Sequence, residues 1–332
     1  MKKFLSKLGL FLLPLFILGI VALFFYVKTD VYGDFTKKDN FAWNYNFQQL
    51  NDISTKKLLS THRTYNSFVL GSSRSCSIYG CYLQTKLPDA RFFHYANWNE
   101  TIGGILAKLQ YLDASGYQLY NIMVYMDTDY TFNEDGKLSP MDHYLITKES
   151  KAKYYYNHLI AFFSNFDMDK FKILIGEGEQ TSSYVNRKLD PITNDFNHVC
   201  SAEEIRKYQY IQSDEQFKHS MDSLKTSGFF YERPKLQQYK SPQISEDEEV
   251  MIEQIATLLE KHHSKYYVVL TPLYDQQKLS NKDFNILKKH FKNNLYDFSG
   301  INKYTDDFYN YPDRIHFQNY ISKQIIDSVV VK

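Results

Sequence analysis

The chain opens with an apolar block at residues 8–27, which reads LGLFLLPLFILGIVALFFYV and carries no charged side chain. Its 20 residues are enough to cross the hydrocarbon core of a bilayer as a helix. A cleaved signal peptide needs a shorter apolar core and a small-x-small cleavage site, whereas Ala22 is followed by Leu23 and Phe24. The pattern therefore predicts an uncleaved anchor, with residues 1–27 forming the N-terminus and one transmembrane helix.

Beyond this block, short apolar runs rich in aromatic and β-branched residues alternate with segments of helical character. Alternation of this kind is typical of an α/β fold built on a parallel sheet. The pattern predicts strands at residues 68–70, 92–95, 122–125, 171–175, 266–270 and 295–298.

Helices are expected in the intervals between these strands. Residues 102–112 form one such interval, and Ser245 with Glu248 gives the spacing of a capping box before apolar residues at helical period. A terminal amphipathic helix is expected from Phe317. Helices on both sides of a parallel sheet would complete the layered α/β architecture.

Two segments depart from the alternation. Residues 28–67 are polar and aromatic without strong strand character, and we expect a membrane-proximal stalk with one helix near residues 43–59. Residues 177–242 are polar and lack a clear strand, which predicts an insertion with its own helix from about Ser201. The α/β domain is accordingly predicted at residues 68–332, with the insertion inside it.

Three basic residues, Lys2, Lys3 and Lys7, precede the apolar block. By the positive-inside rule they keep the N-terminus in the cytoplasm and send everything after Lys28 to the periplasm or the cell exterior. ATP and nicotinamide cofactors are scarce there, and the sequence contains neither a P-loop nor a GxGxxG motif. We therefore expect a protein without a cofactor.

The composition limits the classes of function. Lys and Arg number 39 against 38 Asp and Glu, and this balance without a basic cluster argues against nucleic-acid binding. The 29 Tyr and 25 Phe can bury a sizeable core. A mean hydropathy of -0.47 excludes a polytopic membrane protein while allowing a single span. No CxxC or His/Cys cluster suggests zinc, and Cys76 and Cys81 can pair only if the local backbone permits, with Cys200 remote.

The first predicted strand runs into Gly71, Ser72 and Ser73, where a helix should begin. Ligands of open parallel sheets bind outside the carboxyl ends of the strands, so a serine at this point faces the crevice. Backbone N–H groups at a helix start can also stabilise an oxyanion. A nucleophilic serine is one interpretation, and a serine that merely caps the helix is the other.

A nucleophilic serine needs a base, and two Asp-x-x-His patterns supply candidates: Asp195 with His198, and Asp313 with His316. Three residues of separation can bring a carboxylate beside an imidazole and orient it. The first pair lies in the predicted insertion. The second follows the last predicted strand and should reach the same sheet edge as Ser73, which favours Asp313 and His316.

These residues carry a resemblance to a known group. The block Val69–Ser73, VLGSS, resembles the first block of the membrane-anchored SGNH/GDSL-like proteins, with Gly-Ser-Ser in place of Gly-Asp-Ser. The block Asp313–Phe317, DRIHF, is similar to their C-terminal Asp-x-x-His. The group includes the D-alanyl transfer protein of teichoic-acid modification and acetyltransferases of alginate and related polysaccharides. The resemblance covers roughly residues 68–330 and implies a three-layer, flavodoxin-like parallel sheet flanked by helices.

The resemblance also implies roles for individual residues. Ser73 would be the nucleophile, His316 the base and Asp313 its orienting partner. The second block of the group contributes a glycine N–H to the oxyanion hole, and residues 97–104 are the natural match. Gly103 is the residue chosen there, although a glycine pair that simply opens the following helix is an equal interpretation.

The third block departs from the hydrolase pattern, which has an asparagine at this point. Asp127 and Asp129 stand there, and an ionised carboxylate would repel an oxyanion. Either Asn97 or Asn99 substitutes, or the hole has only two backbone donors. One of the two aspartates is expected to pair with Arg74 or to orient a sugar hydroxyl, rather than to hold a metal ion.

The resemblance implies acyl-ester chemistry on a cell-envelope polysaccharide or other glycan, most simply O-acyl transfer through an acyl group on Ser73. A carbohydrate esterase with the same triad and a non-catalytic envelope scaffold with a degenerate site are the alternatives. In related systems a membrane-bound O-acyltransferase supplies the donor, and it would be the expected partner. The glycan, the acyl group and the oligomeric state stay open at this point.

Overall fold

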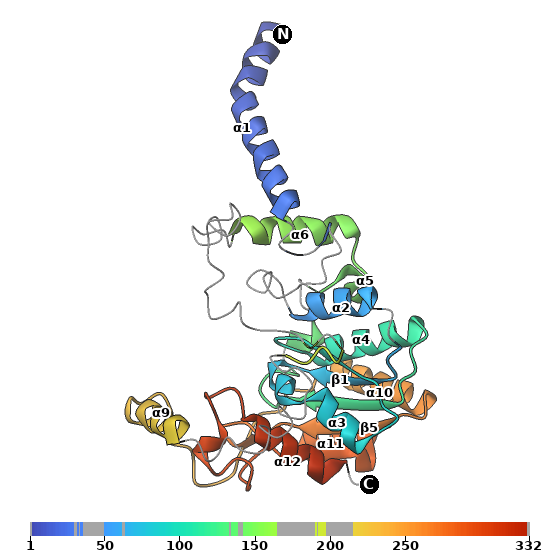
Figure 1. Cartoon of the computed structure of the whole chain (residues 1–332), viewed down its shortest axis with the longest axis vertical. Coiled ribbons are helices and arrows are strands. Elements are labelled where there is room, and N and C mark those ends of the chain that lie inside the picture. The colour runs from blue at the N-terminus through green and yellow to red at the C-terminus, as the bar shows by residue number, and fades with distance from the viewer. Residues whose placement is uncertain are drawn as a thin grey trace. The chain divides into compact units, whose positions relative to one another are not determined.

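The chain divides into two compact units in the computed structural model (Figure 1). The first unit comprises Met1–Gln48 and Ser150–Arg187, and the second comprises Gln49–Glu149 and Lys188–Lys332. Residues 150–187 thus group with the N-terminal segment, whereas the sequence placed them in the α/β domain. The structure describes residues 2–29, 32, 34–35, 50–61, 64–132, 134–138, 142–164, 190, 192–196 and 215–330.

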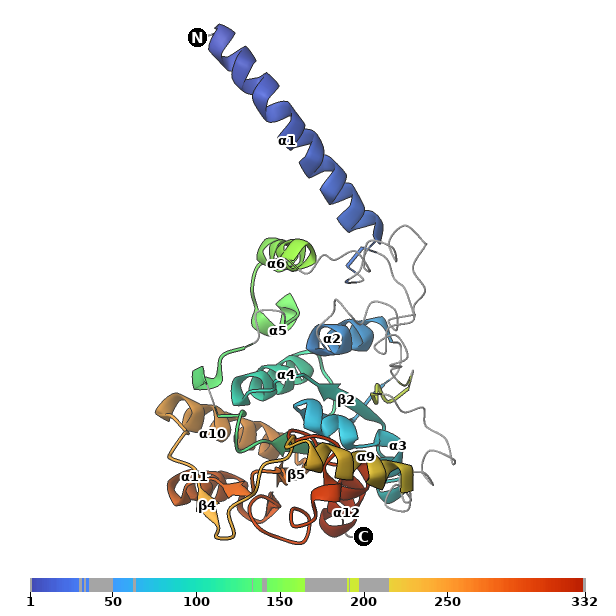
Figure 2. The ribbon, with the colours of Figure 1, turned by 90° about the vertical axis from the view of Figure 1, so that its left-hand side faces the viewer.

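The first unit contains the helices α1 (Lys2–Thr29) and α6 (Lys151–Ser164) (Figure 2). The helix α1 includes the whole predicted apolar block and is long and apolar enough to cross a membrane. The helix α6 packs on the end of α1, where the rings of Tyr26 and Phe162 lie 5.6 Å apart. One N-terminal apolar helix is therefore a feature of the fold as well as of the sequence.

Five parallel strands form the main sheet of the second unit, in the order β2-β1-β3-β5-β7. Every predicted strand in the described ranges is present, and residues 171–175 lie outside those ranges. Counted along the chain, this order is one of the two common orders of doubly wound α/β sheets. The strands are β1 (Ser67–Gly71), β2 (Phe92–Ala96), β3 (Asn121–Met126), β5 (Lys265–Leu270) and β7 (Leu295–Asp297).

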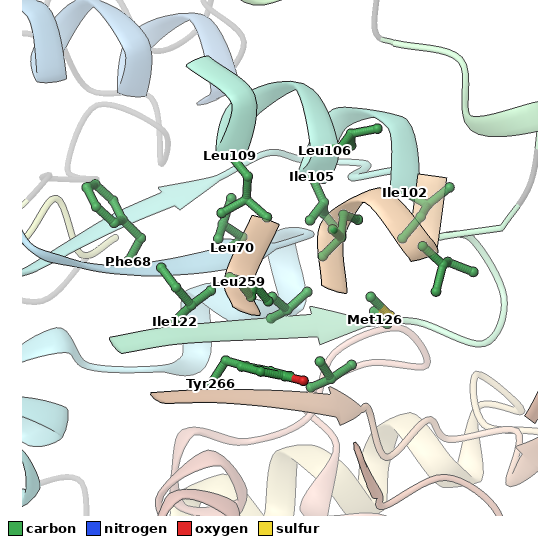
Figure 3. Packing of buried hydrophobic residues seen from close by; sticks show 14 of the residues in the cluster. Phe68, Leu70, Ile102, Ile105, Leu106, Leu109, Ile122, Met126, Leu259 and Tyr266 are labelled. Carbon is green, nitrogen blue, oxygen red and sulfur yellow. The ribbon is translucent and has the colours of Figure 1, made fainter. Parts of the chain in front are cut away.

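Side chains of each strand alternate between the two faces of this sheet, as strand geometry requires. Phe68 and Leu70 belong to the core on one face, together with Ile105 and Leu109 (Figure 3), whereas Val69 belongs to the core on the other face. The first core includes residues of α4 (Ile102–Ala114), α10 (Glu246–Lys261) and α11 (Asn281–Phe291), and the second includes residues of α3 (Gly80–Lys86) and α12 (Asn319–Val329).

The helix starts follow local capping chemistry. Ser245 and Glu248 form the predicted capping box of α10, with the serine side chain accepting from the Glu248 N–H and the glutamate side chain accepting from the Ser245 N–H. Thr101 caps α4 by accepting from Gly104 N–H at 3.1 Å. The terminal helix begins at Asn319, two residues after the predicted start, because Gln318 still has extended backbone angles.

The predicted stalk is only partly separate from the α/β unit. The helix α2 (Leu50–Ser60) packs against β2, and its Thr55 hydroxyl lies 2.7 Å from the Tyr95 hydroxyl. Ile53 and Leu58 of α2 are buried. The residues from α2 to β1 therefore belong to the α/β unit, and residues 43–49 of the predicted stalk helix lie outside the described ranges.

The predicted insertion is not free of strands. The strand β4 (Gln238–Tyr239) pairs in parallel with β6 (Gln277–Lys278), so the end of this segment joins a second, two-stranded sheet. The helix expected from Ser201 lies outside the described ranges as far as residue 214. The remaining elements are α5 (Tyr144–Thr147), α9 (Glu215–Thr226) and the 3-10 turns η2 (Ser73–Ser77), η3 (Glu134–Gly136), η5 (Lys292–Asn294) and η6 (Phe308–Asn310).

Candidate active site

The turn that follows β1 separates the two interpretations of its serines. Ser72 is the cap of η2, because its side chain accepts from the Arg74 N–H at 3.1 Å. Ser73 is the first residue of η2 and is half-buried, with its hydroxyl directed to another partner. Gly71 has φ +152°, and a Cβ there would lie 2.8 Å from the Tyr125 Cβ of β3. Glycine is therefore needed for the close approach that ends β1.

Ser73, His316 and Asp313 form one row of hydrogen bonds. The Ser73 Oγ lies 3.0 Å from His316 Nε2, and His316 Nδ1 lies 2.9 Å from Asp313 Oδ2. These distances fall in the range expected of a nucleophile, its base and the group that orients the base. The row joins the end of the first strand to the loop before α12, which are 243 residues apart in the chain.

The Asp313 carboxylate is held by its own loop. Its Oδ1 accepts from the backbone N–H groups of Ile315 and His316, both at 2.7 Å. Burial by itself raises the pKa of Asp313, but the hydrogen bonds and the charge of His316 outweigh it, so the pKa lies below its ordinary value. The carboxylate is ionised at neutral pH and keeps the Nδ1 proton on the side of the ring away from Ser73.

Arg74 joins three loops of the site, and its side chain is only 7% exposed. Its guanidinium makes two parallel bonds to Asp129, at 2.7 and 2.8 Å, and lies 3.1 Å from Asp127. Its Nε donates to the carbonyl of Ile315 at 2.7 Å. The predicted pairing of Arg74 with an aspartate of the third block is confirmed, and it extends to both aspartates. Burial lowers the pKa of Arg74, but these carboxylates raise it by more, so the charge is fixed.

The loop after β2 lies directly beside the candidate nucleophile. The N–H of Asn97 donates to the carbonyl of Gly71 at 3.1 Å, and the N–H of Ser73 donates to the carbonyl of Trp98 at 3.3 Å. The Asn97 side chain accepts from the Trp98 N–H at 2.7 Å, and Asn99 is exposed. Because Trp98 occupies the Ser73 N–H, that donor must be released before it can bind an oxyanion.

Gly103 lies in the first turn of α4, in contact with the backbone of Gly136. A Cβ on Gly103 would lie 1.8 Å from the Gly136 carbonyl oxygen, so this close packing alone requires a glycine. No hydrogen bond joins Gly103 to Ser73 among the residues that the structure describes. The geometry agrees with the interpretation in which the glycine pair opens the helix.

The loop after β3 carries Asp127, Thr128 and Asp129 where the third block of the group has an asparagine. The Asp127 carboxylate accepts from the Thr271 hydroxyl at 2.6 Å and pairs with Arg74. Thr128 is fully buried, and its hydroxyl has no hydrogen-bond partner in the described part of the chain. Thr128 is thus the residue of this loop with an uncommitted donor.

A second row of the same three residue types, Ser75, His94 and Asp195, supports the turn η2 from the interior of the protein. The hydroxyl of Ser75 lies 3.1 Å from His94 Nε2, and His94 Nδ1 lies 3.2 Å from Asp195 Oδ1. Ser75 also donates to the Ser72 carbonyl at 2.7 Å, and the Gly80 N–H donates to Asp195 at 2.7 Å. All three members of this row are buried, so they have no access to a substrate.

This second row gives Asp195 a partner that the sequence pattern did not indicate. The sequence pairs it with His198, three residues away, whereas its carboxylate binds His94 and Gly80, and His198 lies outside the described ranges. The available signal was a histidine in the middle of the apolar strand Phe92–Ala96, where a polar side chain needs a partner. Spacing along the chain could not show that the partner lies 101 residues away.

Aromatic and basic side chains flank the loop that carries His316. The Arg314 guanidinium lies 5.0 Å from the Phe229 ring centroid, and Arg233 lies 4.8 Å from the Tyr274 ring centroid. Tyr231 is 44% exposed and packs edge-on against Tyr274. This surface is suited to stacking on a planar or ring-shaped ligand next to the candidate triad.

Cys76 and Cys81 are not joined to each other by a disulfide. Cys76 in η2 and Cys81 in α3 form no disulfide in the described part of the chain, and Cys200 lies outside it. Within the described ranges no cluster of three or more His, Cys, Asp or Glu side chains could hold a metal ion. Asp127 and Asp129 instead share the guanidinium of Arg74.

The known protein families offer no further assignment of this site. The chain matches no family model and no curated protein.

Proposed function

We propose that the protein is a membrane-anchored, SGNH-like enzyme that transfers an acyl group to a hydroxyl of a cell-envelope glycan. The row Ser73, His316 and Asp313 is the observation that carries this proposal, because a serine within 3.0 Å of an oriented imidazole is the minimal apparatus for acyl transfer. The strand order and the position of Ser73 at the carboxyl end of β1 agree with it.

The geometry supports a two-step mechanism. The Ser73 hydroxyl gives its proton to His316 Nε2, and its oxygen forms a bond to the acyl carbon of the donor. The bond between that carbon and the leaving group breaks, and His316 returns the proton to the leaving group. A glycan hydroxyl then gives its proton to His316, and its oxygen forms a bond to the acyl carbon. The bond between that carbon and the Ser73 Oγ breaks, and His316 passes the proton to the Oγ. Asp313 holds the imidazolium that forms in each step.

The charge of the tetrahedral intermediate needs donors close to Ser73. The N–H of Ser73, released from Trp98, is the donor that this chain offers there. Asn97 and Asn99 would take part only after a rearrangement of the loop after β2.

An anchored enzyme works close to the bilayer. With α1 in the membrane and the N-terminal lysines in the cytoplasm, the α/β unit would face the periplasm or cell exterior. A donor handed over by a membrane-bound O-acyltransferase would reach it there, and the exposed aromatics beside Arg314 would bind sugar rings. No cofactor enters the proposed steps.

The test is acyl transfer from a synthetic acetyl ester to an oligosaccharide, measured by mass spectrometry in parallel with hydrolysis to water. We expect Ser73→Ala and His316→Ala each to lower turnover by at least about 10³-fold while the circular dichroism spectrum is unchanged. His263→Ala is the matched control and should keep full activity. His263 precedes β5, at the amino ends of the strands, whereas Ser73 lies at their carboxyl ends.

The same experiment separates the alternatives. Acetate release without transfer to the oligosaccharide would favour a carbohydrate esterase with the same three residues. A folded Ser73→Ala protein with full activity would remove the proposed mechanism. If a serine-directed fluorophosphonate leaves no adduct on Ser73 in the unsubstituted protein, a non-catalytic scaffold becomes the better description. The hydrogen bond from the Ser73 N–H to Trp98 would then explain the missing reactivity.

A further inference from the structure

The helix α6 carries two opposite stripes of apolar side chains. Tyr154 and Phe162 are buried, with His158 between them at helical spacing. Tyr156, Ile160 and Phe163 lie on the opposite side and are 61%, 47% and 44% exposed. A helix that is buried on one side usually presents polar residues on the other, so the second apolar stripe needs a partner of its own.

The buried stripe of α6 packs on the chain segment that leaves α1. The ring of Phe162 lies 5.6 Å from that of Tyr26, and the ring of His158 stacks on that of Tyr32 at 4.3 Å. Phe35 stacks on Tyr155 at 6.0 Å. These contacts place α6 beside the last turn of α1 (Figure 1).

A buried carboxylate fixes this arrangement. Asp34 accepts from His158 Nδ1 at 2.7 Å, from the Tyr154 hydroxyl at 3.1 Å and from the Tyr26 hydroxyl at 3.4 Å. Its side chain is only 2% exposed, so these bonds replace water around it. The carboxylate therefore ties two turns of α6 to the end of α1 and sets the height of α6 relative to the membrane segment.

The depth of α6 follows from the position of Tyr26. The apolar block that is long enough to span a bilayer ends at Val27, so Tyr26 belongs to its last turn. A helix that touches this turn lies at the boundary between hydrocarbon and headgroups, since the rise is about 1.5 Å per residue. Aromatic side chains are favoured at this depth.

The chemistry of the exposed side of α6 matches this location. Its exposed stripe is aromatic and aliphatic, and the whole helix contains no acidic residue. Two exposed lysines, Lys151 and Lys153, stand at its first turn. A helix with an apolar stripe and basic residues alone is suited to a surface of anionic lipids.

We propose that α6 is an interfacial helix, which lies in the plane of the membrane surface with Tyr156, Ile160 and Phe163 in contact with lipid. The proposal needs α1 to span the membrane but is independent of the ester chemistry. Together α1 and α6 give the protein two membrane contacts. The second contact restricts the rotation of the N-terminal unit about the axis of α1.

Fluorescence quenching by brominated lipids tests this proposal on the full-length protein. Ile160→Trp, Leu18→Trp and Tyr239→Trp are each reconstituted in phosphatidylcholine and phosphatidylglycerol vesicles, whose acyl chains carry no bromine, bromine near the headgroup or bromine near the chain end. The emission of the new tryptophan is obtained by subtracting the emission of the unsubstituted protein. For Ile160→Trp we expect this difference to be lower in brominated vesicles. Leu18→Trp reports insertion of α1, and Tyr239→Trp, on an exposed strand of the α/β unit, should not be quenched.

Two results would overturn the interfacial placement while Leu18→Trp is quenched. One is emission of Ile160→Trp that responds to bromine no more than that of Tyr239→Trp. The other is a blue-shifted emission of Ile160→Trp without quenching, which would mean that protein rather than lipid covers the stripe. A Leu18→Trp protein that is not quenched would instead refute the anchor itself, and the interfacial helix with it.

Discussion

At the scale of single residues, Arg74 holds the loop that carries His316 in place beside Ser73. The loop with His316 reaches Ser73 through one hydrogen bond, and the Nε of Arg74 binds the Ile315 carbonyl in the same loop. The rest of the guanidinium binds Asp129 through both carboxylate oxygens. A planar fork with five donors can hold two loops in register, whereas an ammonium group has no fixed geometry.

Arg74→Lys should therefore separate charge from geometry. We expect at least about a tenfold loss of turnover, because the lysine cannot bind Asp129 bidentately and reach the Ile315 carbonyl at once. A loss of about 2 kcal/mol in the free energy of unfolding should accompany it, since the buried Asp127 and the partly exposed Asp129 lose the guanidinium. Steady-state kinetics with a soluble ester and thermal unfolding measure the two effects.

Arg91→Lys is the matched control for this substitution. The Arg91 side chain is exposed, and its Nε donates to the Thr64 carbonyl at 2.6 Å. Arg91 precedes β2 and so lies at the amino ends of the strands, away from Ser73. A change of less than about 0.5 kcal/mol is expected there. Unchanged turnover in a stable Arg74→Lys protein would show that Arg74 does not position the His316 loop.

At the scale of elements, β2 acts as a support for the turn after β1. The two strands are in register from Ser67 and Phe92 onward, and this register brings His94 of β2 beneath Ser75 of η2. Asp195 then orients the imidazole and also accepts from the first residue of α3. The buried row thus connects a strand, a turn and a helix by hydrogen bonds inside the core.

His94→Phe removes this support while keeping a ring of similar size in the core. We expect about 3 kcal/mol of destabilisation, because the Asp195 carboxylate is left buried without His94. In the folded fraction, the rate of fluorophosphonate labelling of Ser73 should also fall. A structural role alone would lower stability and leave the labelling rate per folded molecule unchanged, and that outcome would refute a positioning role.

The elements themselves followed largely from hydrophobic periodicity. The strands at 68–70 and 122–125 are apolar at every position because parallel strands are covered on both faces, and Ser245 marks the start of α10 through its own capping bonds. The helix α6 was not predicted, since an aromatic run such as Tyr154 to Tyr156 has no polar face to mark its period.

The candidate site was predictable only where its partners lie close together in sequence or at strand ends. Asp313 and His316 are three residues apart, and Ser73 follows a strand, so their meeting could be argued from topology. The role of His94 depends on a contact across 101 residues, which local pattern cannot show. The packing of Gly103 on Gly136 likewise became visible only in the folded chain.

At the scale of the whole molecule, the helices α3 and α12 on one face of the sheet are joined by an ionic contact at the surface. The carboxylate of Asp327 in α12 lies 2.6 Å from the ammonium groups of both Lys323 and Lys86, the latter in α3. Burial by itself raises the pKa of Asp327, but the hydrogen bonds from Lys323, Lys86 and Tyr82 outweigh it and lower the pKa to about 2. The two lysines in turn have raised pKa values, so they stay charged.

This contact predicts how acid weakens the α/β unit. A carboxylate whose pKa is lower in the folded state than its ordinary 3.8 contributes stability above that value and loses it as the pH falls towards 2. Because Asp327 is about one-third exposed, solvent screening leaves about 1 kcal/mol of this contribution. Asp327→Asn should therefore be less stable than the unsubstituted protein at pH 7, and the difference should vanish between pH 4 and about 2. Thermal unfolding of the full chain in detergent measures this difference in stability, and Asp89→Asn, at an exposed position, is the control. A difference that stays constant down to pH 2 would contradict the role given to Asp327.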